Sequence, residues 1–373
     1  MLSENERIAL YTLMEIPGMY TRKLNRIYRM TGSFEEILKT DEADLTARGL
    51  WGSRMEKGVF DRFRNDSSFL SVCRETYRSL PSRKVRMIDF SEPEMPERFR
   101  QLADPPNAIF VKGRLPDASI PCAAIIGSRK CSDYGSEVAR AFGRRLSEAG
   151  VQILSGMAMG IDTDALRGGL EGPSGCFGVL GSGVNICYPA SSRTVYNRMC
   201  GGRGGVLSEY CPDARGLGYH FVTRNRLIAA LCDVLLVIEA GEKSGTSITV
   251  ENALELGRDI FALPGRITDP LGFGCNRLIR DGAQALTCPE DVLEYLGIEG
   301  PESRTALSCA VSAGLSEDEK KILSLLGPDP VHIDHLCVNS GLSSADVSVL
   351  LDGLEEKGAI RCVSGASFVK RYR

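Results

Sequence analysis

Short apolar, β-branched runs alternate with amphipathic segments through the middle of the chain. One such segment, residues 135–149, places Val138, Phe142 and Leu146 on one helical face. A strand, helix, strand repeat at this spacing is typical of right-handed crossovers between parallel strands, in a sheet covered on both faces. The pattern therefore predicts a Rossmann-like α/β domain over residues 76–298. Its expected strands fall within 122–127, 151–156, 176–181, 205–210, 234–240 and 260–265.

Helical spacing broken by turn signals occupies residues 1–75, which we predict to form a small helical domain. Within it, the stretch 16–24, IPGMYTRKL, resembles half of a helix-hairpin-helix, an element that lays backbone amides against DNA phosphates. Tyr20 stands where the second glycine of that hairpin would lie, so a small packing domain is the alternative. Residues 71–120 are expected to be a connector that leads into a strand at 108–113.

The C-terminal part of the chain has a third pattern. A stretch rich in Pro, Glu and Ser, residues 299–315, predicts a linker. Residues 316–373 predict three short helices and a hairpin, which is the winged-helix pattern. The last of these helices, 343–357, would pack through Val347, Leu350, Leu351 and Leu354 and expose mainly acidic side chains. Phosphate would repel such a helix, so we expect it to bind protein or to regulate.

The composition mainly argues against certain classes of protein, namely membrane proteins, exported proteins and proteins with a metal site. With 43% hydrophobic and 25% charged residues, the chain is typical of a soluble globular protein. It has no apolar run of about 20 residues and no signal peptide at its start, so we expect a cytoplasmic protein without membrane contact. Thirteen scattered cysteines without a CxxC pair, and only three histidines, predict buried reduced thiols and no metal site.

The ends of the predicted strands carry the candidate chemistry. In parallel sheets ligands bind beyond the carboxyl ends of the strands, where glycine permits close approach and amides and hydroxyls bind phosphate oxygens. No GxGxxG motif in the correct register and no GxxxxGK[ST] motif is present, so we predict no nucleotide cofactor. The candidate residues at these ends are Gly127, Ser128, Arg129, Lys130, Ser155, Gly156, Gly181, Gly183, Lys243, Ser244 and Gly245.

A net charge of −3 means that any site for a polyanion must be a local patch. Between residues 187 and 226 six arginines stand against Glu209 and Asp213, a local excess of +4. The arginines are Arg193, Arg198, Arg203, Arg215, Arg224 and Arg226. With Arg129, Lys130 and Lys243 they predict a groove that follows phosphates, although Arg198 and Arg203 can equally be solvated surface.

Two features of these loops refine the groove. The RNR sequence at 224–226 is expected to open a helix, where cations oppose the helix dipole unless an anion compensates them. Aromatic residues in the same loops, Tyr219 and Phe221, would stack on the bases of a single strand. We interpret the third aromatic, Tyr188, as a core residue.

Five motifs occur in a characteristic order: GSR (127–129), SGMAMGID (155–162), RNRLIAAL (224–231), EAGEKSGTSITVENALELGRDIFALPG (239–265) and GFGCNRLIRDGA (272–283). Over residues 90–297 the chain closely resembles the DNA-processing protein A (DprA, also called Smf) family. The resemblance implies a single-stranded-DNA-binding protein of natural transformation and homologous recombination. Such a protein coats incoming DNA as a homodimer and helps to load the RecA recombinase, without an enzymatic step or a cofactor.

The resemblance also implies roles for residues. Arg129 and Lys243 would contact phosphates, and Arg224 and Arg226, with the intervening Asn225, would line the same groove. The family often has a lysine before its RNR helix and FP where this chain has Phe221-Val222. Arg215 is the nearest cation to the position of that lysine.

A nucleotide hydrolase is the competing interpretation. The stretch SGTSITVE (244–251) is similar to the GGxGTxxE turn of nucleoside-monophosphate phosphoribohydrolases. Its glutamate, Glu251, lies two residues beyond the place of the catalytic one, and this shift turns the carboxylate away from the turn. Asp162, Asp164 and Glu209 also lie near strand ends, where an acid/base pair would be needed. We interpret the two aspartates as helix N-terminal acids and Glu209 as a partner of neighbouring arginines.

Overall fold

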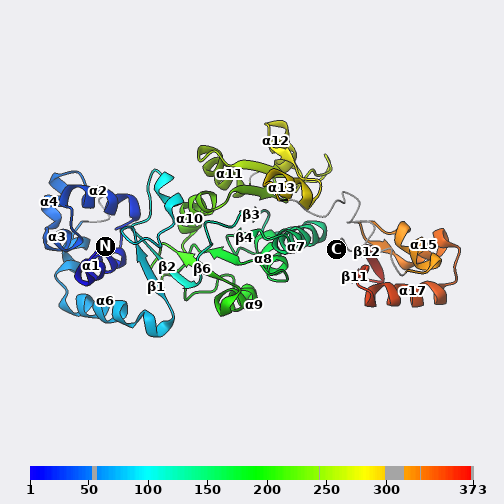
Figure 1. Cartoon of the computed structure of the whole chain (residues 1–373), viewed down its shortest axis with the longest axis horizontal. Coiled ribbons are helices and arrows are strands. Elements are labelled where there is room, and N and C mark those ends of the chain that lie inside the picture. Colours follow the sequence, from blue (N-terminus) through cyan, green and yellow to red (C-terminus); the bar gives the residue numbers. More distant parts are fainter. Residues whose placement is uncertain (53–56, 243, 299–314, 328, 371–373) are drawn as a thin grey trace.

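The computed structural model describes residues 1–52, 57–242, 244–298, 315–327 and 329–370. A helical N-terminal domain, a central domain built on a sheet and a small C-terminal domain follow one another along the longest axis of the molecule (Figure 1). The central domain carries the strand ends from which the sequence predicts a site.

The central sheet has nine strands in the order β1-β2-β6-β5-β4-β3-β7-β8-β9. Neighbouring strands from β6 to β9 are parallel, whereas β2 is antiparallel to both β1 and β6. The predicted Rossmann-like sheet is confirmed. The strands span Arg86–Asp89 (β1), Ala108–Gly113 (β2), Cys122–Ile126 (β3), Gln152–Ser155 (β4), Cys176–Val179 (β5), Gly204–Ser208 (β6), Val234–Val237 (β7), Asp259–Ala262 (β8) and Gln284–Ala285 (β9).

Helices cover both faces of this sheet because successive strand residues point to opposite sides. In β3, Ala123 and Ile125 join the core beneath α7 and α8, whereas Ala124 and Ile126 join the core beneath α10 and α11. Ser132 caps the start of α7 by accepting a hydrogen bond from the amide of Gly135. The helices are α7 (Asp133–Glu148), α8 (Ile161–Gly169), α9 (Arg193–Arg198), α10 (Gly218–Leu231), α11 (Thr246–Glu255), α12 (Phe273–Arg280) and α13 (Pro289–Tyr295).

The N-terminal helices pack directly against the edge of the sheet. Tyr11 of α1 lies edge-on to Phe110 of β2, with ring centroids 5.9 Å apart. Tyr11, Cys73 and Leu80 belong to the same hydrophobic core as Phe110 and Ile125 of the sheet. The N-terminal helices are α1 (Glu4–Glu15), α2 (Thr21–Thr31), α3 (Phe34–Lys39), α4 (Glu42–Ala47), α5 (Val59–Arg64) and α6 (Ser67–Ser79).

The C-terminal domain has a winged-helix arrangement with a core of its own, as the sequence predicts. Val347, Leu351 and Leu354 of α17 are buried in that core, and Asp352 and Glu355 on the same helix are exposed. The predicted linker lies almost wholly outside the described residues. The elements are α15 (Glu317–Leu325), β10 (Val331–His332), α16 (Ile333–Ser340), α17 (Ser344–Glu356), β11 (Ile360–Ser364) and β12 (Ser367–Lys370).

Among the described residues, two arginines form ion pairs between the C-terminal domain and the central domain. Arg361 of β11 lies 3.4 Å from Asp133 and 3.4 Å from Glu137 at the start of α7. Arg266, after β8, lies 2.5 Å from Asp329 of the C-terminal domain. The domain is therefore held against the loops around α7 by charge rather than by a shared apolar core.

Two expectations from composition bear on the fold. Every cysteine in the described ranges is a free thiol, and most of them are buried as small core residues, whereas Cys362 is exposed. Within the same ranges, none of the helices has both the length and the apolar character needed to cross a bilayer.

Candidate nucleic-acid interface

The topology brings the candidate loops to one edge of the sheet. Because the five strands β3, β4, β5, β6 and β7 are neighbours in the sheet and all run parallel, the loops that leave their carboxyl ends emerge side by side. We call this edge the rim. At about 4.8 Å between neighbouring strands, the four steps from β6 to β7 give it a length of about 19 Å. Apart from residue 243, it consists of the loops 127–131, 156–160, 180–189, 209–217 and 238–245.

Three cations stand free on the rim. Arg129 and Lys130 follow β3 and Arg215 follows β6, and all three side chains are exposed. Within the part of the chain that the structure describes, none of them forms an ion pair. Exposed cations without carboxylate partners keep their full attraction for an anion.

Phe221 of α10 lies at the centre of the rim. The Arg129 guanidinium carbon lies 6.0 Å from the centroid of its ring, within the range of a cation–π contact. The Tyr188 ring lies 5.4 Å from it, centroid to centroid. Gly216, which directly follows Arg215, is also close to this ring, because a Cβ on Gly216 would lie 2.7 Å from the Phe221 ring. Phe221 therefore lies close to Arg129, Tyr188 and Gly216, which belong to three different loops of the rim.

Two tyrosines extend this apolar surface into solvent. Tyr188 is 57% exposed and Tyr219 is 63% exposed. The interpretation of Tyr188 as a core residue is therefore wrong. The physical reason is that Tyr196 fills the core of this region instead, where its hydroxyl donates a hydrogen bond to the Val184 carbonyl at 2.5 Å. Large exposed aromatics beside free cations form a surface on which bases can stack.

Arg224 is not part of the exposed surface, contrary to the groove that the sequence predicts. It is 4% exposed, and its Nη1 donates to the carbonyl of Gly156 at 2.7 Å and to that of Val179. Burial lowers the pKa of Arg224 to about 10, and the buried Asp162 nearby opposes that shift. Burial also raises the pKa of Asp162. Arg224 thus holds the ends of β4 and β5 together from within.

The other members of the RNR motif are also engaged inside the protein. Arg226 pairs with the buried carboxylate of Glu209, at the end of β6. Thr21 of the N-terminal domain donates to the same carboxylate at 3.4 Å. Asn225 accepts a hydrogen bond from Arg224 Nε at 3.1 Å. Arg224 and Arg226 thus link α10 to the sheet, and Glu209 extends the link to the N-terminal domain, instead of lining an open groove.

Several predicted glycines serve packing between loops rather than close approach to a ligand. A Cβ at Gly156 would lie 2.6 Å from the Arg224 guanidinium, one at Gly181 2.6 Å from the Phe221 ring, and one at Gly183 2.1 Å from the Cys211 carbonyl. All three glycines are buried. Their absence of a side chain lets the loops of the rim pack tightly, which corrects our expectation that they meet the ligand.

The first turn of the rim is partly open. Gly127 and Ser128 are half-buried, and the Ser128 hydroxyl accepts a hydrogen bond from the Lys130 amide at 3.2 Å. The Ser128 carbonyl accepts one from the amide of Ile161 at 3.3 Å. Ser155, in contrast, is fully buried and donates to the Ile125 carbonyl at 2.6 Å. The hydroxyl of Ser128 is therefore the accessible one of the two.

The KSG turn before α11 is described only in part. Lys243 lies outside the described residues. Ser244 accepts a hydrogen bond from the Thr246 hydroxyl at 2.9 Å, and Gly245 is exposed at the start of the helix. The turn places Gly245 at the surface of the rim.

Two of the six clustered arginines lie away from the rim. Arg198 and Arg203 donate to the carbonyl of Leu170, which follows α8, at 2.7 Å and 3.3 Å. Leu170 precedes β5, so it belongs to the opposite edge of the sheet. Both side chains are exposed at that edge, in line with the alternative that they are solvated surface.

The acids proposed for hydrolysis are held in ion pairs or face solvent. Asp164 lies 2.5 Å from Arg167 and accepts from the Ser136 hydroxyl at 2.7 Å, and Glu209 is paired with Arg226. Burial raises the pKa of Glu209, and Arg226 opposes the shift. Glu251 is exposed on α11. Asp162 and Asp164 lie in the first turn of α8, and Glu209 pairs with Arg226, as we interpret them from the sequence.

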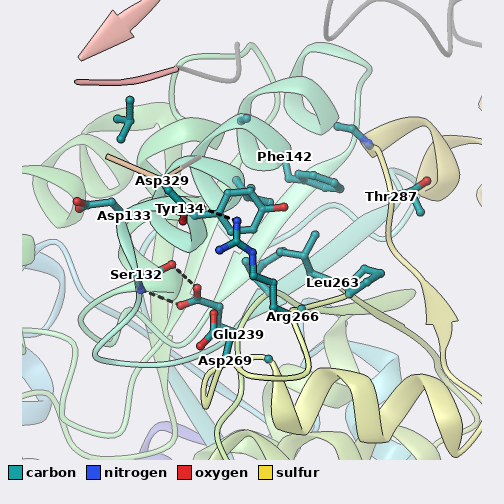
Figure 2. A pocket seen from close by; sticks show the side chains of 18 of the residues that line it. Ser132, Asp133, Tyr134, Phe142, Glu239, Leu263, Arg266, Asp269, Thr287 and Asp329 are labelled. Atoms are coloured by element: carbon teal, nitrogen blue, oxygen red, sulfur yellow. Dashed lines mark hydrogen bonds and ion pairs between the residues drawn. The ribbon is translucent and has the colours of Figure 1, made fainter. Parts of the chain in front are cut away.

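A separate cavity of about 600 Å³ lies between the central and C-terminal domains. Figure 2 shows Arg266 reaching across it towards Asp329, with Glu239 held by Ser132 at its lower side. Asp133 and Asp269 also line the cavity. An anionic polymer would meet these carboxylates, so the cavity differs in character from the rim.

The sequence matches two family models. Residues 86–297 match the family described as DNA recombination-mediator protein A. Residues 309–366 match the DprA winged helix domain. The matches cover the central sheet and the C-terminal domain.

Characterised relatives are similar over most of their length. The chain is 36% identical to the DNA processing protein DprA of Streptococcus pneumoniae over 260 residues, which cover 69% of this chain and 87% of that protein. It is 32% identical to Protein Smf of Escherichia coli over 312 residues, or 81% of this chain and 83% of that protein.

Solved structures extend the similarity to the fold. The X-ray structure of DNA processing protein A from Streptococcus pneumoniae superimposes with a TM-score of 0.64 at 30% identity, covering 80% of this chain and 99% of that one. A structure of DNA processing protein A from Helicobacter pylori, concerned with the single-stranded DNA binding mode of that protein, gives a TM-score of 0.51 at 27% identity. It covers 57% of this chain and 95% of that one.

Proposed function

Since the chain belongs to the DNA recombination-mediator protein A family, also known as DprA or Smf, we propose that it binds single-stranded DNA along the rim. In this proposal the cytoplasmic protein protects incoming single strands during natural transformation and homologous recombination. It acts as a homodimer, helps to load the RecA recombinase and catalyses no reaction. The RecA and homodimer parts rest on the resemblance carried by the five ordered motifs.

The observation that carries the proposal is the set of groups around Phe221. Arg129 lies over its ring, Tyr188 lies beside it, and both Arg129 and Tyr188 are exposed. Stacking of bases on aromatic rings contributes about 1–3 kcal/mol per base and tolerates any sequence. Cations beside such rings attract the phosphates between the bases. This combination suits a single strand, whose bases are free to stack.

We assign different roles to the exposed and the buried residues of the site. Arg129, Lys130 and Arg215 contact phosphates, together with Lys243 of the KSG turn. Backbone groups of the half-buried and exposed turn residues, Gly127, Ser128, Ser244 and Gly245, approach the same strand. Arg224, Asn225 and Arg226 hold the loops in place from within and do not contact DNA.

The relative from Helicobacter pylori supports this assignment of the ligand, because the work on its structure concerns single-stranded DNA binding. Its fold covers 57% of this chain.

A salt titration of oligonucleotide affinity tests the proposal. On single strands, log affinity falls with log salt with a slope of about −0.7 for each phosphate contact. Arg129→Ala should weaken binding to every sequence and flatten the slope by about 0.7. Arg140→Ala is the matched control, because Arg140 is an exposed arginine on α7 that pairs with Glu171.

The proposal fails if Arg129→Ala and Lys130→Ala both retain the affinity and the salt slope of the unmodified chain. Incubation with AMP in the same experiments separates the competing interpretation, since stoichiometric release of adenine would indicate a phosphoribohydrolase.

A further inference from the structure

Helix α2 of the N-terminal domain carries a row of exposed arginines. Arg22, Arg26 and Arg29 are all exposed, and their spacing of four and three residues puts them on one face. At about 1.5 Å per residue, the row is about 10 Å long. We call it the α2 arginine row.

The row lacks strong internal partners. Arg22 is 72% exposed and lies 3.8 Å from the nearest oxygen of Asp104, a long ion pair. Arg26 and Arg29 form no ion pair with any residue in the described ranges. Arg22 also lies in the first turn of α2, where a cation opposes the helix dipole. An external anion would supply these arginines with a partner and would offset the unfavourable interaction of Arg22 with the helix dipole.

The row lies next to the β6 end of the rim. Thr21, the first residue of α2, donates to Glu209 at the end of β6 at a distance of 3.4 Å. Asn25, on the same helix, donates to the Pro105 carbonyl at 2.8 Å, in the loop that precedes β2. Because β2 is antiparallel to β6, that loop lies at the same edge as the rim. The rim and the α2 arginine row are therefore neighbours.

The N-terminal end of α2 also presents an aromatic ring. Tyr20 directly precedes the helix and is 57% exposed. The rim combines free cations with exposed aromatics in the same way. Glu209, which accepts a hydrogen bond from Thr21 of α2, is also held by its buried ion pair with Arg226 of α10, so the contact between the rim and α2 is fixed from both helices.

From this arrangement we propose that the α2 arginine row is a second contact region for the phosphate backbone of the same single strand. The inference rests on the proposed function and extends the path of the DNA onto the N-terminal domain. From β3 to β2 the edge measures about 19 Å, at about 4.8 Å per strand step. With the row, the path is about 30 Å long, so only a sufficiently long oligonucleotide reaches both regions.

The test compares two matched double variants of the full chain. Arg26→Ala/Arg29→Ala removes two charges from the row, and Arg74→Ala/Arg78→Ala removes two exposed arginines, of which Arg78 pairs with Glu4, from α6 of the same domain. Figure 1 shows that α2 and α6 lie on opposite sides of the N-terminal domain. Alanine is the best helix former, so neither variant should unfold its helix, and circular dichroism checks this.

Affinity is measured for thymidine oligonucleotides of about 5 to about 25 nucleotides as a function of salt. For the long oligonucleotides, the α2 variant should lose two contacts, so its salt slope should be flatter by about 1.4. A fourfold rise in salt should then weaken binding about sevenfold less than in the unmodified chain. For the shortest oligonucleotides its affinity should be unchanged, and the α6 variant should follow the unmodified chain at every length.

The two proposals fail in different ways. If the unmodified chain binds long oligonucleotides, Arg129→Ala weakens that binding, and the α2 and α6 variants have equal slopes, the α2 arginine row is not a contact and the rim remains the site. If the unmodified chain does not bind single strands at any length, the proposed function itself is wrong. An α2 effect that is equally large at the shortest lengths would also overturn the inference, because it would mean a separate site.

Discussion

At the scale of single residues, Arg224 shows that a buried cation can shape the rim without reaching its surface. Its guanidinium donates hydrogen bonds to two backbone carbonyls at the ends of β4 and β5, and Asp162 is the neighbouring buried charge. A buried cation of this kind stabilises only while its partners are present. Its removal leaves a carboxylate that burial already disfavours.

Arg224→Met should therefore lower the free energy of unfolding by about 3–5 kcal/mol, because Asp162 is left buried without its counter-charge. Urea denaturation measures the loss. The double variant Arg224→Met/Asp162→Asn should recover part of it, since the isolated charge is then gone. A single variant within about 0.5 kcal/mol of the unmodified chain would contradict the internal role of Arg224.

Residue type alone predicts only part of the site. Arg129, Lys130 and Arg215 reach the surface of the rim as expected, because each lies in a loop that leaves the carboxyl end of a strand. The positions of Arg224 and Tyr188 depend on which neighbour fills the core. That choice is made by packing between segments far apart in the sequence, such as Gly156 against Arg224, and no local pattern reveals it.

At the scale of elements, the residue at which α10 begins determines whether the side chains of the RNR motif face solvent or the protein interior. We expect from the sequence that RNR opens the helix, but α10 begins at Gly218, so Arg224 lies in its second turn and faces inward. The central strands could be predicted because their apolar runs are long and regular. Strand β1 lies in a segment that we expect to be a connector, since its four residues carry little pattern.

His220 in the first turn of α10 gives the stability a dependence on pH. Its Nδ1 accepts a hydrogen bond from the Leu217 amide at 3.4 Å, and burial lowers its pKa below the ordinary value of 6.5. The neutral imidazole is thus favoured in the folded state, and its protonation also opposes the helix dipole. The contribution to stability is present above pH 6.5 and is lost as the pH falls through the folded pKa.

Denaturation of the unmodified chain and of His220→Gln at pH 7.5 and at lower pH values checks this sign. The unmodified chain should lose more free energy of unfolding on acidification than the variant. An NMR titration midpoint for His220 at or above 6.5 would contradict the prediction.

At the scale of the whole molecule, the two flanking domains are attached in different ways. The N-terminal helices share a hydrophobic core with the sheet through Tyr11 and Phe110. The C-terminal domain has a core of its own and meets the central domain through the ion pairs of Arg361 and Arg266. Exposed ion pairs contribute little, typically about 0–1 kcal/mol each.

Calorimetry of two core variants tests this difference. Tyr11→Ala should lower the unfolding temperature of the sheet, because truncating a large buried side chain costs about 3–5 kcal/mol. Leu351→Ala in α17 should cost about 2–5 kcal/mol but shift only a separate transition of the C-terminal domain. A single transition that moves equally in both variants would contradict two independent folding units.

The unequal attachment has a consequence for how such a gene can change over evolutionary time. A C-terminal module with a closed core can be lost, duplicated or exchanged between genes without exposing apolar surface on what remains. The helices that bear the α2 arginine row lack this freedom, because their excision would uncover Phe110 at the sheet edge. Loss of the first domain alone therefore requires compensating changes at this sheet edge, whereas loss of the third does not.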